Sequence, residues 1–324
     1  MNKLYNEKIK EEFLRNYDNH QTQNTIKYLL YKAFSIENIL DKDLYNFNIS
    51  ELGKVIQNTD PLNITVAKTN MRFLTAYISW AIEKGLRNDN LNPLRGIDNE
   101  WLEQFVSKKK LYFSEQEIRD IENKLVNYQD KAILRMLFEG ISGDGVSEIL
   151  NLTERDINDN TLKLNDNKFE PREVVVSDYC LKLIKGALAE KEYKLKNGSV
   201  QRGTKEYNLV SNDYVIRPID RKVLDVNAPS DKHTIYRRIK FISDLSELPY
   251  LNVKNIERSG MIYYGKLLYE QEGSLGKEQL DKIGDKFGIR KVNINGYLNY
   301  NTTVLREYIN EDNIMELYGV KINN

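Results

Sequence analysis

The chain has 324 residues, enough for two domains, and its 40% hydrophobic and 30% charged content excludes disordered and fibrous proteins. Its 48 basic and 48 acidic residues exclude an overall basic composition but leave room for a local basic face. Cys180 is the only cysteine, and His20 and His233 are far apart in the sequence, so we expect no disulfide, no metal site and no cofactor.

The first hundred residues are expected to be helical. The clearest helical period runs over residues 65–84, and its predicted apolar face is formed by Val66, Phe73, Leu74, Tyr77, Ile78 and Ala81. The opposite face carries Lys68, Thr69 and Arg72, with Asn70 at its edge. Cations beside hydroxyl and amide groups favour base reading in DNA by this helix. A shorter helix is expected over residues 22–34.

A basic segment marks the expected domain boundary. Lys108, Lys109 and Lys110 come shortly before Ser114 and Glu117, which have the spacing of a capping box at the start of a helix. We therefore predict a helical domain over residues 1–106, a basic linker over 107–113 and a second domain over 114–324.

The second domain is predicted to be mainly helical with one β-hairpin. Alternating apolar residues predict strands around Leu162 to Leu164 and Val174 to Val176, joined by a turn. Helices are expected to start near Glu115 and over 132–139, 179–194, 234–243, 255–269 and 277–286, with another near the C-terminus. Residues 196–208 are expected to form a long exposed loop.

Common enzyme signatures are absent. The sequence contains no GxGxxG or GxxxxGKS/T phosphate loop, no GxSxG elbow and no HExxH. The glycines of "GISGDG" at 140–145 do not predict a phosphate loop, because no strand precedes them and no Lys-Ser/Thr pair follows.

Four short motifs occur in a fixed order. The first is "NP" at Asn92-Pro93, and the second is "YFSEQEI" at 112–118. The third is "GVSEILNLTERDI" at 145–157, which is followed by the hairpin "KFEPREVVV". The fourth is "LNVKNIERSG" at 251–260 together with "KFGIRKVNINGYLNY" at 286–300. In this order they resemble the tyrosine recombinase (phage integrase) family over nearly the whole chain. The third matches the family pattern G-L/M-R-I/L-S-E-L/I/V-x-x-L-x-x-x-D-I at Ser147, Glu148, Ile149, Leu152, Asp156 and Ile157.

The resemblance implies a mainly α fold with a small antiparallel β-hairpin or sheet, in two domains. The first would be a helical core-binding domain, and the second an α+β domain like the family's catalytic domain. Together they would grip double-stranded DNA. In the family, two arginines stabilise the charge on the scissile phosphate, a hairpin lysine and histidines move protons, and a tyrosine attacks phosphorus.

The same resemblance predicts that these catalytic residues are not intact here. Gly145 and Glu257 fall on the two arginine positions, with Arg258 one residue beyond the second, while Lys254 and Ile289 fall on histidine positions. Lys168 fits the hairpin lysine, and Tyr297 or Tyr300 lies near the position of the nucleophile. An acid at an arginine position repels phosphate.

Contacts to the DNA backbone do not depend on cleavage, because they rest on Lys and Arg charges alone. The candidate DNA-binding residues are Lys68, Thr69, Arg72, Lys108, Lys109, Lys110, Lys168, Arg172, Arg237, Arg238, Lys240, Lys254 and Arg258.

The resulting hypothesis is an inactive, integrase-like protein that binds specific DNA sites and represses transcription to maintain phage lysogeny. The alternatives are an active integrase that works through a 3'-phosphotyrosine, and an accessory factor for a partner recombinase. Expected partners are double-stranded operator DNA, a second copy of the chain, and a regulatory protein or peptide. No apolar run of about 18 residues and no signal peptide is recognised, so we expect a cytoplasmic, nucleoid-associated protein without membrane contact.

Overall fold

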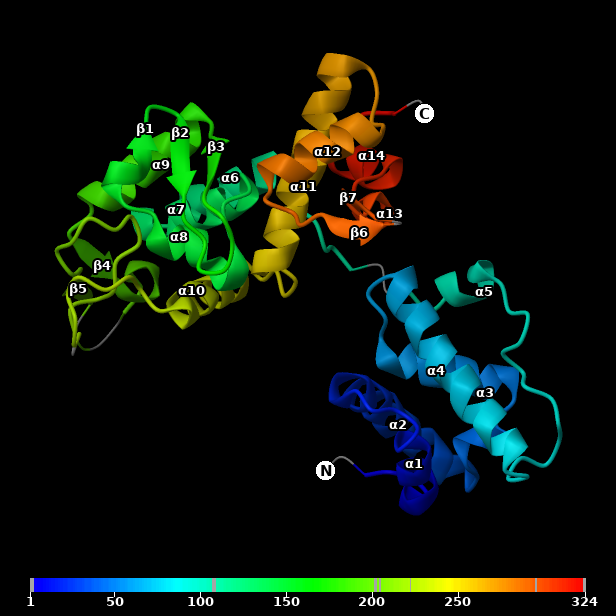
Figure 1. Ribbon diagram of the computed structural model, residues 1–324. Helices are drawn as coiled ribbons and strands as arrows, with labels where there is room; N and C mark the ends of the chain where they lie inside the picture. Colours follow the sequence, from blue (N-terminus) through cyan, green and yellow to red (C-terminus); the bar gives the residue numbers. More distant parts are fainter. Residues whose placement is uncertain are drawn as a thin grey trace. The chain divides into compact units, whose positions relative to one another are not determined.

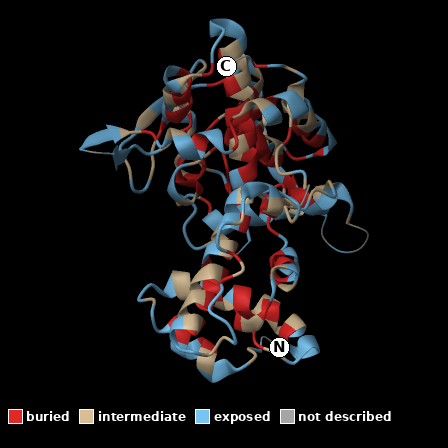
Figure 2. Cartoon of the chain, turned by 90° about the vertical axis from the view of Figure 1, so that its right-hand side faces the viewer, coloured by how far each residue is buried: buried red, intermediate tan, exposed pale blue. Residues whose placement is uncertain are grey.

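The computed structural model describes residues 3–106, 109–200, 203, 205–221, 223–294 and 296–322. The chain divides into two compact units, Met1–Lys109 and Lys110–Asn324 (Figure 1). Segments coloured as buried lie towards the inside of each unit, and exposed segments lie on its outside (Figure 2). Each unit has a hydrophobic core of its own.

The first unit is built from helices only among its described residues. These are α1 (Glu7–Leu14), α2 (His20–Leu40), the short 3-10 helix η1 (Leu44–Asn46), α3 (Ile49–Thr59), α4 (Ile64–Glu83) and α5 (Asn99–Glu103). Asparagine side chains cap three of them: Asn19 for α2, Asn48 for α3 and Asn63 for α4. Helix α4 confirms the period found in the sequence, and α2 extends further in both directions than predicted.

Two details of the predicted α4 faces are wrong. Val66 is 41% exposed, and Ala67 occupies the buried position instead. Asn70 is buried, and its Nδ2 donates a hydrogen bond to Thr59 Oγ1 at 2.9 Å. At about 100° per residue, the stripe through positions 67, 70, 74 and 77 faces the core, so Asn70 belongs to the interior and is not available to DNA bases.

A buried ionic cluster joins α1 to α2 and η1. Lys10 is fully buried, and its Nζ lies 2.6 Å from Glu37 Oε1 and 3.2 Å from Asp43 Oδ2. Burial raises the pKa of Glu37 to about 7, although Lys10 acts in the opposite direction. The Tyr77 hydroxyl donates to Asp43 Oδ1 at 2.9 Å. The cluster therefore balances two buried carboxyl groups mainly with one ammonium group.

The second unit is arranged around α7 (Tyr128–Phe138), which contacts α6 (Glu115–Lys124), α9 (Asp178–Ala189), α10 (Lys232–Leu245) and α11 (Val253–Glu272). All its residues from Gln129 to Phe138 except Lys131 are buried, as expected for a central helix. Helix α11 approaches it closely at Gly260, where an added Cβ would lie 1.7 Å from Phe138 O. Any larger residue at 260 would push the two helices apart.

Seven further short or peripheral helices are described in this unit. They are η2 (Asp144–Val146), α8 (Ser147–Asn151), η3 (Glu154–Asp156), η4 (Leu195–Gly198), α12 (Lys277–Lys286), α13 (Thr302–Arg306) and α14 (Glu311–Tyr318). The capping box of Ser114 and Glu117 is present at the start of α6.

The predicted hairpin is part of a three-stranded antiparallel sheet in the order β1 (Ile157–Asn158), β2 (Thr161–Leu164), β3 (Arg172–Val175). Its register pairs Leu162 with Val174. Two further antiparallel pairs were missed: β4 (Glu192–Lys194) with β5 (Glu206–Asn208), and β6 (Val292–Ile294) with β7 (Tyr297–Asn299). Helix α9 therefore ends before the predicted residue 194, and the 196–208 segment is not all loop. These strands have only three residues each, too few to show a period of two.

Replacing Lys10 with Ala should strongly destabilise the first unit, because it leaves Glu37 and Asp43 buried without their cation. The expected loss in the free energy of unfolding is about 3 to 5 kcal/mol. Both tryptophans of the chain, Trp80 and Trp101, lie in this unit, so their fluorescence during urea denaturation reports on it alone. Lys8→Ala, at an exposed position of the same helix, should change the value by less than about 0.5 kcal/mol. Equal stability of the two variants would contradict the prediction.

Candidate functional site

A cavity of about 950 Å³ in the second unit gathers residues from four parts of the chain. They come from the bend after α7, the loop between β2 and β3, the middle of α11, and the segment from the end of α12 to Tyr300. Gly145, Glu257, Ile289 and Tyr300 all line this cavity. Positions that the family resemblance associates with catalysis therefore lie together in space.

The bend after α7 has an unusual backbone. Gly143 and Gly145 have φ values of +75° and +62°, and Val146, although β-branched and buried, has φ +63°. A β-branched residue in this region is a strained outlier, so its surroundings must hold it. Asp166, from the β2–β3 loop, accepts hydrogen bonds from the Asp144 backbone N–H at 2.6 Å and the Ser147 hydroxyl at 3.1 Å.

Asp166 also accepts hydrogen bonds from the backbone N–H groups of Lys168 and Phe169. Partial burial raises the pKa of Asp166, but these donors outweigh it and hold the pKa below its ordinary value. Asp166 therefore stays ionised and ties the bend to the hairpin loop.

Arg172 connects several parts of the site through hydrogen bonds. Its guanidinium donates to both carboxylate oxygens of Glu148, at 2.6 and 2.8 Å, and to the backbone oxygens of Gly140 and Lys286, at 2.6 and 2.7 Å. It thus links β3, α8, the end of α7 and the end of α12. Four of its five N–H donors are used inside the protein, which disfavours the predicted contact of Arg172 with DNA.

Carboxylates outnumber cations around the cavity. The acids are Asp144, Glu148, Asp166, Glu170, Glu257 and Asp285, and the bases are Arg172, Arg290 and Lys291. Burial raises the pKa of Glu257 above its ordinary value. A hydrogen bond from Ser142 lowers this pKa, whereas the nearby charge of Glu148 raises it further. Among the described residues, no group of His, Cys, Asp and Glu is arranged to hold a metal ion. The charge balance disfavours an anion in this cavity.

The two candidate nucleophiles differ in their surroundings. Tyr300 is 6% exposed, and its hydroxyl donates to Asp285 Oδ1 at 2.5 Å. Burial and this hydrogen bond raise its pKa, which disfavours the phenolate that would attack phosphorus. Tyr297 is 75% exposed on β7 and is not among the residues that line the cavity.

Arg258 lies outside the cavity lining. Its guanidinium lies over the ring of Tyr308, 4.7 Å from the ring centre, and it lines neither this cavity nor a neighbouring one of about 430 Å³. Lys254, the other basic residue of this motif, is exposed and lines the neighbouring cavity. Lys168 is also exposed, with its Nζ 3.9 Å from Asp144 Oδ1.

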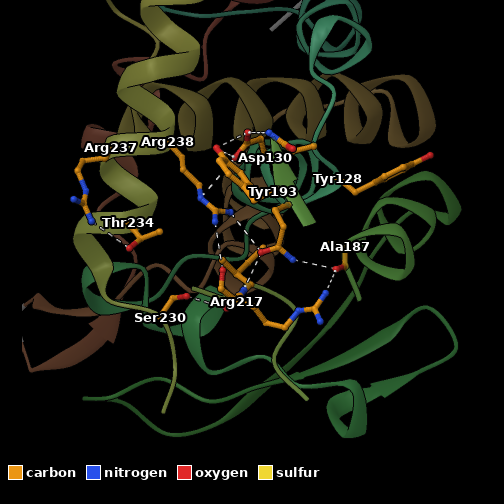
Figure 3. Close-up of polar contacts among 12 residues, drawn as sticks. Tyr128, Asp130, Ala187, Tyr193, Arg217, Ser230, Thr234, Arg237 and Arg238 are labelled. Atoms are coloured by element: carbon orange, nitrogen blue, oxygen red, sulfur yellow. Dashed lines mark hydrogen bonds and ion pairs between the residues drawn. The ribbon is translucent and has the colours of Figure 1, made fainter. Parts of the chain in front are cut away.

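Adjacent arginines on α10 point in opposite directions (Figure 3). Arg238 is buried beside Asp130, at 3.7 Å, and stacks on the ring of Tyr193 at 4.5 Å, whereas Arg237 is exposed beside Thr234. The predicted DNA contact of Arg238 is therefore corrected, because its charge is used within the core. Arg237 and Lys240 remain on the exposed face of the helix, where Lys240 pairs with Asp244.

The candidates in and near the first unit fall into two groups. Lys68 and Arg72 are exposed on α4, and the Thr69 hydroxyl donates to the backbone oxygen of Thr65 at 3.0 Å. The lysines of the predicted linker have acidic neighbours: Lys109 pairs with Asp60 and Lys110 with Glu117. Lys108 lies outside the described residues.

Sequence reasoning missed three exposed residues near the site: Lys232, Tyr236 and Arg290. Arg290 follows the degenerate position 289 directly, and its guanidinium lies over the Phe169 ring at 3.1 Å. Lys232 and Tyr236 are one helical turn apart on α10, in the same basic stretch as Arg237. That spacing was visible in the sequence, but the proximity of α10 to the bend was not.

Replacing Gly143 with Ala should destabilise the second unit by at least about 3 kcal/mol. Its φ/ψ of +75°/−176° is open almost only to glycine, and the added Cβ would lie 2.3 Å from Asp166 Oδ2. Gly145→Ala is the matched control: its φ is also positive, but its Cβ would meet nothing closer than 3.8 Å, so about 1 kcal/mol is expected. Tryptophan fluorescence reports on the first unit alone. A change in far-UV circular dichroism during urea denaturation that fluorescence does not follow therefore reports on unfolding of the second unit. A larger loss for Gly145→Ala would contradict this prediction.

No described helix has the length and apolar composition to cross a membrane. Several solved structures are similar in fold. A XerA recombinase covers 97% of this chain and 98% of its own, with 13% identity and a TM-score of 0.42. The Tn1549 transposon integrase in complex with circular intermediate DNA covers 95% and 97%, with 12% identity and a TM-score of 0.46.

The sequence comparisons are more specific. The chain is 33% identical over 325 residues to the SPbeta prophage-derived uncharacterized protein YopR of Bacillus subtilis (strain 168), with 98% of each chain covered. Residues 4–83 match the model "MrpR, N-terminal core-binding domain", and residues 112–319 match "MrpR, C-terminal catalytic domain". The chain therefore belongs to the MrpR family.

Proposed function

We propose that this protein binds specific sites in double-stranded DNA without cutting them, and that it represses transcription in a temperate phage or prophage. The observation that carries the proposal is the composition of the 950 Å³ cavity. Gly145 and Glu257, which the resemblance assigns to two arginine positions of the tyrosine recombinases, line it, and the Tyr300 hydroxyl donates a hydrogen bond to Asp285.

The energetic argument concerns the transition state of strand cleavage. Phosphoryl transfer adds negative charge at phosphorus, and removing one donor that stabilises such charge costs about 2.7 to 4 kcal/mol. Here two arginine positions lack that donor, and Glu257 adds a carboxyl group in its place. Arg172 could supply charge, but Glu148 and two backbone oxygens already use its donors. Cleavage is therefore disfavoured.

DNA binding needs less than cleavage does. Exposed cations suffice for phosphate contacts, and they remain on α4, at Lys68 and Arg72, and on α10, at Arg237 and Lys240. Each of these helices also presents hydroxyl groups close to its cations, at Thr69 and Tyr236. This combination supports binding that is anchored on phosphates and specified by base edges.

A repressor role follows from binding without cutting. A protein held at an operator obstructs polymerase for as long as it stays bound, whereas a recombinase must act and leave. The relative YopR is named as prophage-derived, which supports the same genetic setting for this chain. DNA footprinting distinguishes the repressor from the accessory-factor alternative. Protection of promoters near the gene of this protein supports repression, and protection of recombination sites alone contradicts repression.

Purified protein should form no covalent adduct with a nicked suicide substrate that carries its binding site. The reason is the missing charge stabilisation at Gly145 and Glu257 together with the raised pKa of Tyr300. Denaturing gel electrophoresis of labelled DNA measures the adduct. An adduct that disappears in Tyr297→Phe or Tyr300→Phe would establish the active-integrase alternative instead.

Replacing Arg72 with Ala should weaken specific DNA binding by about 1 to 3 kcal/mol if its guanidinium reads a base. The affinity for random DNA should then fall much less, because a phosphate contact would affect both sequences equally. Fluorescence anisotropy with operator and random duplexes measures both affinities. Arg95→Ala removes an exposed arginine from a loop of the same unit and should leave both unchanged. If Arg72→Ala does the same, α4 is not in the interface.

A further inference from the structure

The buried ionic cluster of the first unit holds more negative than positive groups. It contains one ammonium group, that of Lys10 on α1, and two carboxyl groups, those of Glu37 on α2 and Asp43 before η1. All three residues are at most 3% exposed. If both carboxyl groups are ionised, one unbalanced negative charge lies away from water, which is costly in a protein interior. One bound proton removes that charge.

The hydrogen bonds of Asp43 occupy both of its carboxylate oxygens. Its Oδ1 accepts from the Tyr77 hydroxyl at 2.9 Å and from the Tyr45 backbone N–H at 3.3 Å. Its Oδ2 accepts from Asn6 Nδ2 at 3.1 Å and from Lys10 Nζ at 3.2 Å. Neither oxygen of Asp43 is therefore without a donor.

The carboxyl group of Glu37 has donors on one side only. Its Oε1 accepts from Lys10 Nζ at 2.6 Å and from the Leu44 backbone N–H at 2.8 Å. Its Oε2 is buried and has no hydrogen-bond partner among the described residues. A charged oxygen in that position lacks both water and a donor, whereas a protonated oxygen carries no charge. The proton that balances the cluster therefore belongs on Glu37.

The other titratable groups that face the cluster, among the residues that the structure describes, do not take this role. Each N–H of the Lys10 ammonium group has an acceptor, since Nζ also donates to the backbone oxygen of Tyr5 at 2.7 Å. Asp41 lies at the exposed edge, where it accepts a hydrogen bond from the Tyr5 hydroxyl at 3.2 Å. Burial and nearby carboxyl groups raise the pKa of each facing phenol above its ordinary value of 10, so the phenols stay neutral near pH 7; they are Tyr5, Tyr45 and Tyr77.

We infer that Glu37 binds one proton near neutral pH and that this proton stabilises the first unit. The cluster joins four elements, because Lys10 belongs to α1, Glu37 to α2 and Tyr77 to α4, while backbone N–H groups of η1 complete it. Its charge balance therefore acts on the packing of most of the unit. The inference concerns the stability of this unit and does not depend on DNA binding.

The direction of the pH effect follows from the pKa of Glu37. Burial raises this pKa from 4.5 to about 7, so the folded unit keeps the proton up to a higher pH than the unfolded chain does. The stabilisation is complete below about pH 4.5 and is lost as the pH rises through about 7. The equilibrium constant for unfolding of the first unit should therefore increase about tenfold from pH 6 to pH 8.

The test is urea denaturation of the full chain at pH 6, 7 and 8, followed by the fluorescence of the two tryptophans of the first unit. Glu37→Gln keeps the shape of the side chain but cannot ionise, so its unfolding constant should change by less than about twofold over this range. Asp43→Asn leaves Lys10 with one carboxyl group, which needs no proton for balance, so it should abolish the tenfold change as well.

Glu11→Gln is the matched control, because Glu11 is an exposed glutamate on α1 outside the cluster, and its removal should keep the tenfold increase. His20 is the only histidine of this unit, and it is exposed. Every variant retains His20, so its contribution cancels in the comparison.

A wild-type unfolding constant that is equal at pH 6 and pH 8, or that decreases as the pH rises, would overturn the inference. A tenfold increase that persists in Glu37→Gln or in Asp43→Asn would also overturn it, because the proton would then be bound elsewhere or for another reason. If one of these variants does not fold, the other decides. No DNA is present in the experiment, so a failure of the proposed DNA-binding function cannot be mistaken for a failure of this inference.

Discussion

The site of this protein depends on the ion pair between Arg172 and Glu148. One guanidinium holds the carboxylate of α8 and the backbone at the ends of α7 and α12, so four elements meet at a single side chain. A planar fork with five donors suits this task, because it can serve several acceptors in fixed directions. Removing either partner would leave the other largely buried and unpaired, and the bend at residues 143–146 would lose its support.

The pairing of Arg172 with Glu148 helps to explain why the cavity is poorly suited to phosphate, although arginine and lysine line it. Cations inside it are used by the protein itself: Arg172 by Glu148, and Lys291 and Arg290 at longer range by Asp285 and Asp144. Two exposed lysines lie beside the cavity, Lys232 on α10 and Lys254 on α11. The cavity therefore holds cations that have acidic partners, whereas exposed cations lie on the neighbouring surface.

The bend shows how far sequence reasoning reached. Its glycines, the motif from Ser147 onward and the degenerate positions 145, 257 and 289 were all readable before the structure, and these positions do line one cavity. The directions of single side chains were not readable. Arg237 and Arg238 are adjacent in sequence, yet one is exposed and the other neutralises buried Asp130 (Figure 3). Asn70 was assigned to the polar face of α4, although its partner Thr59 lies in the core.

By itself, the sequence determined the helical character of both units, the positions of α4, α6, α11 and α12, the β2–β3 pairing and the family resemblance. These follow from local periodicity, capping and short motifs, which involve residues near one another in the chain. The tertiary structure alone decided which cations are free. Arg172 meets an acid 24 positions away and Arg238 meets one 108 positions away, and no local sequence pattern predicts either pairing. Electrostatic function here is a property of packing, because a charge is available to a ligand only where the fold leaves it unpaired.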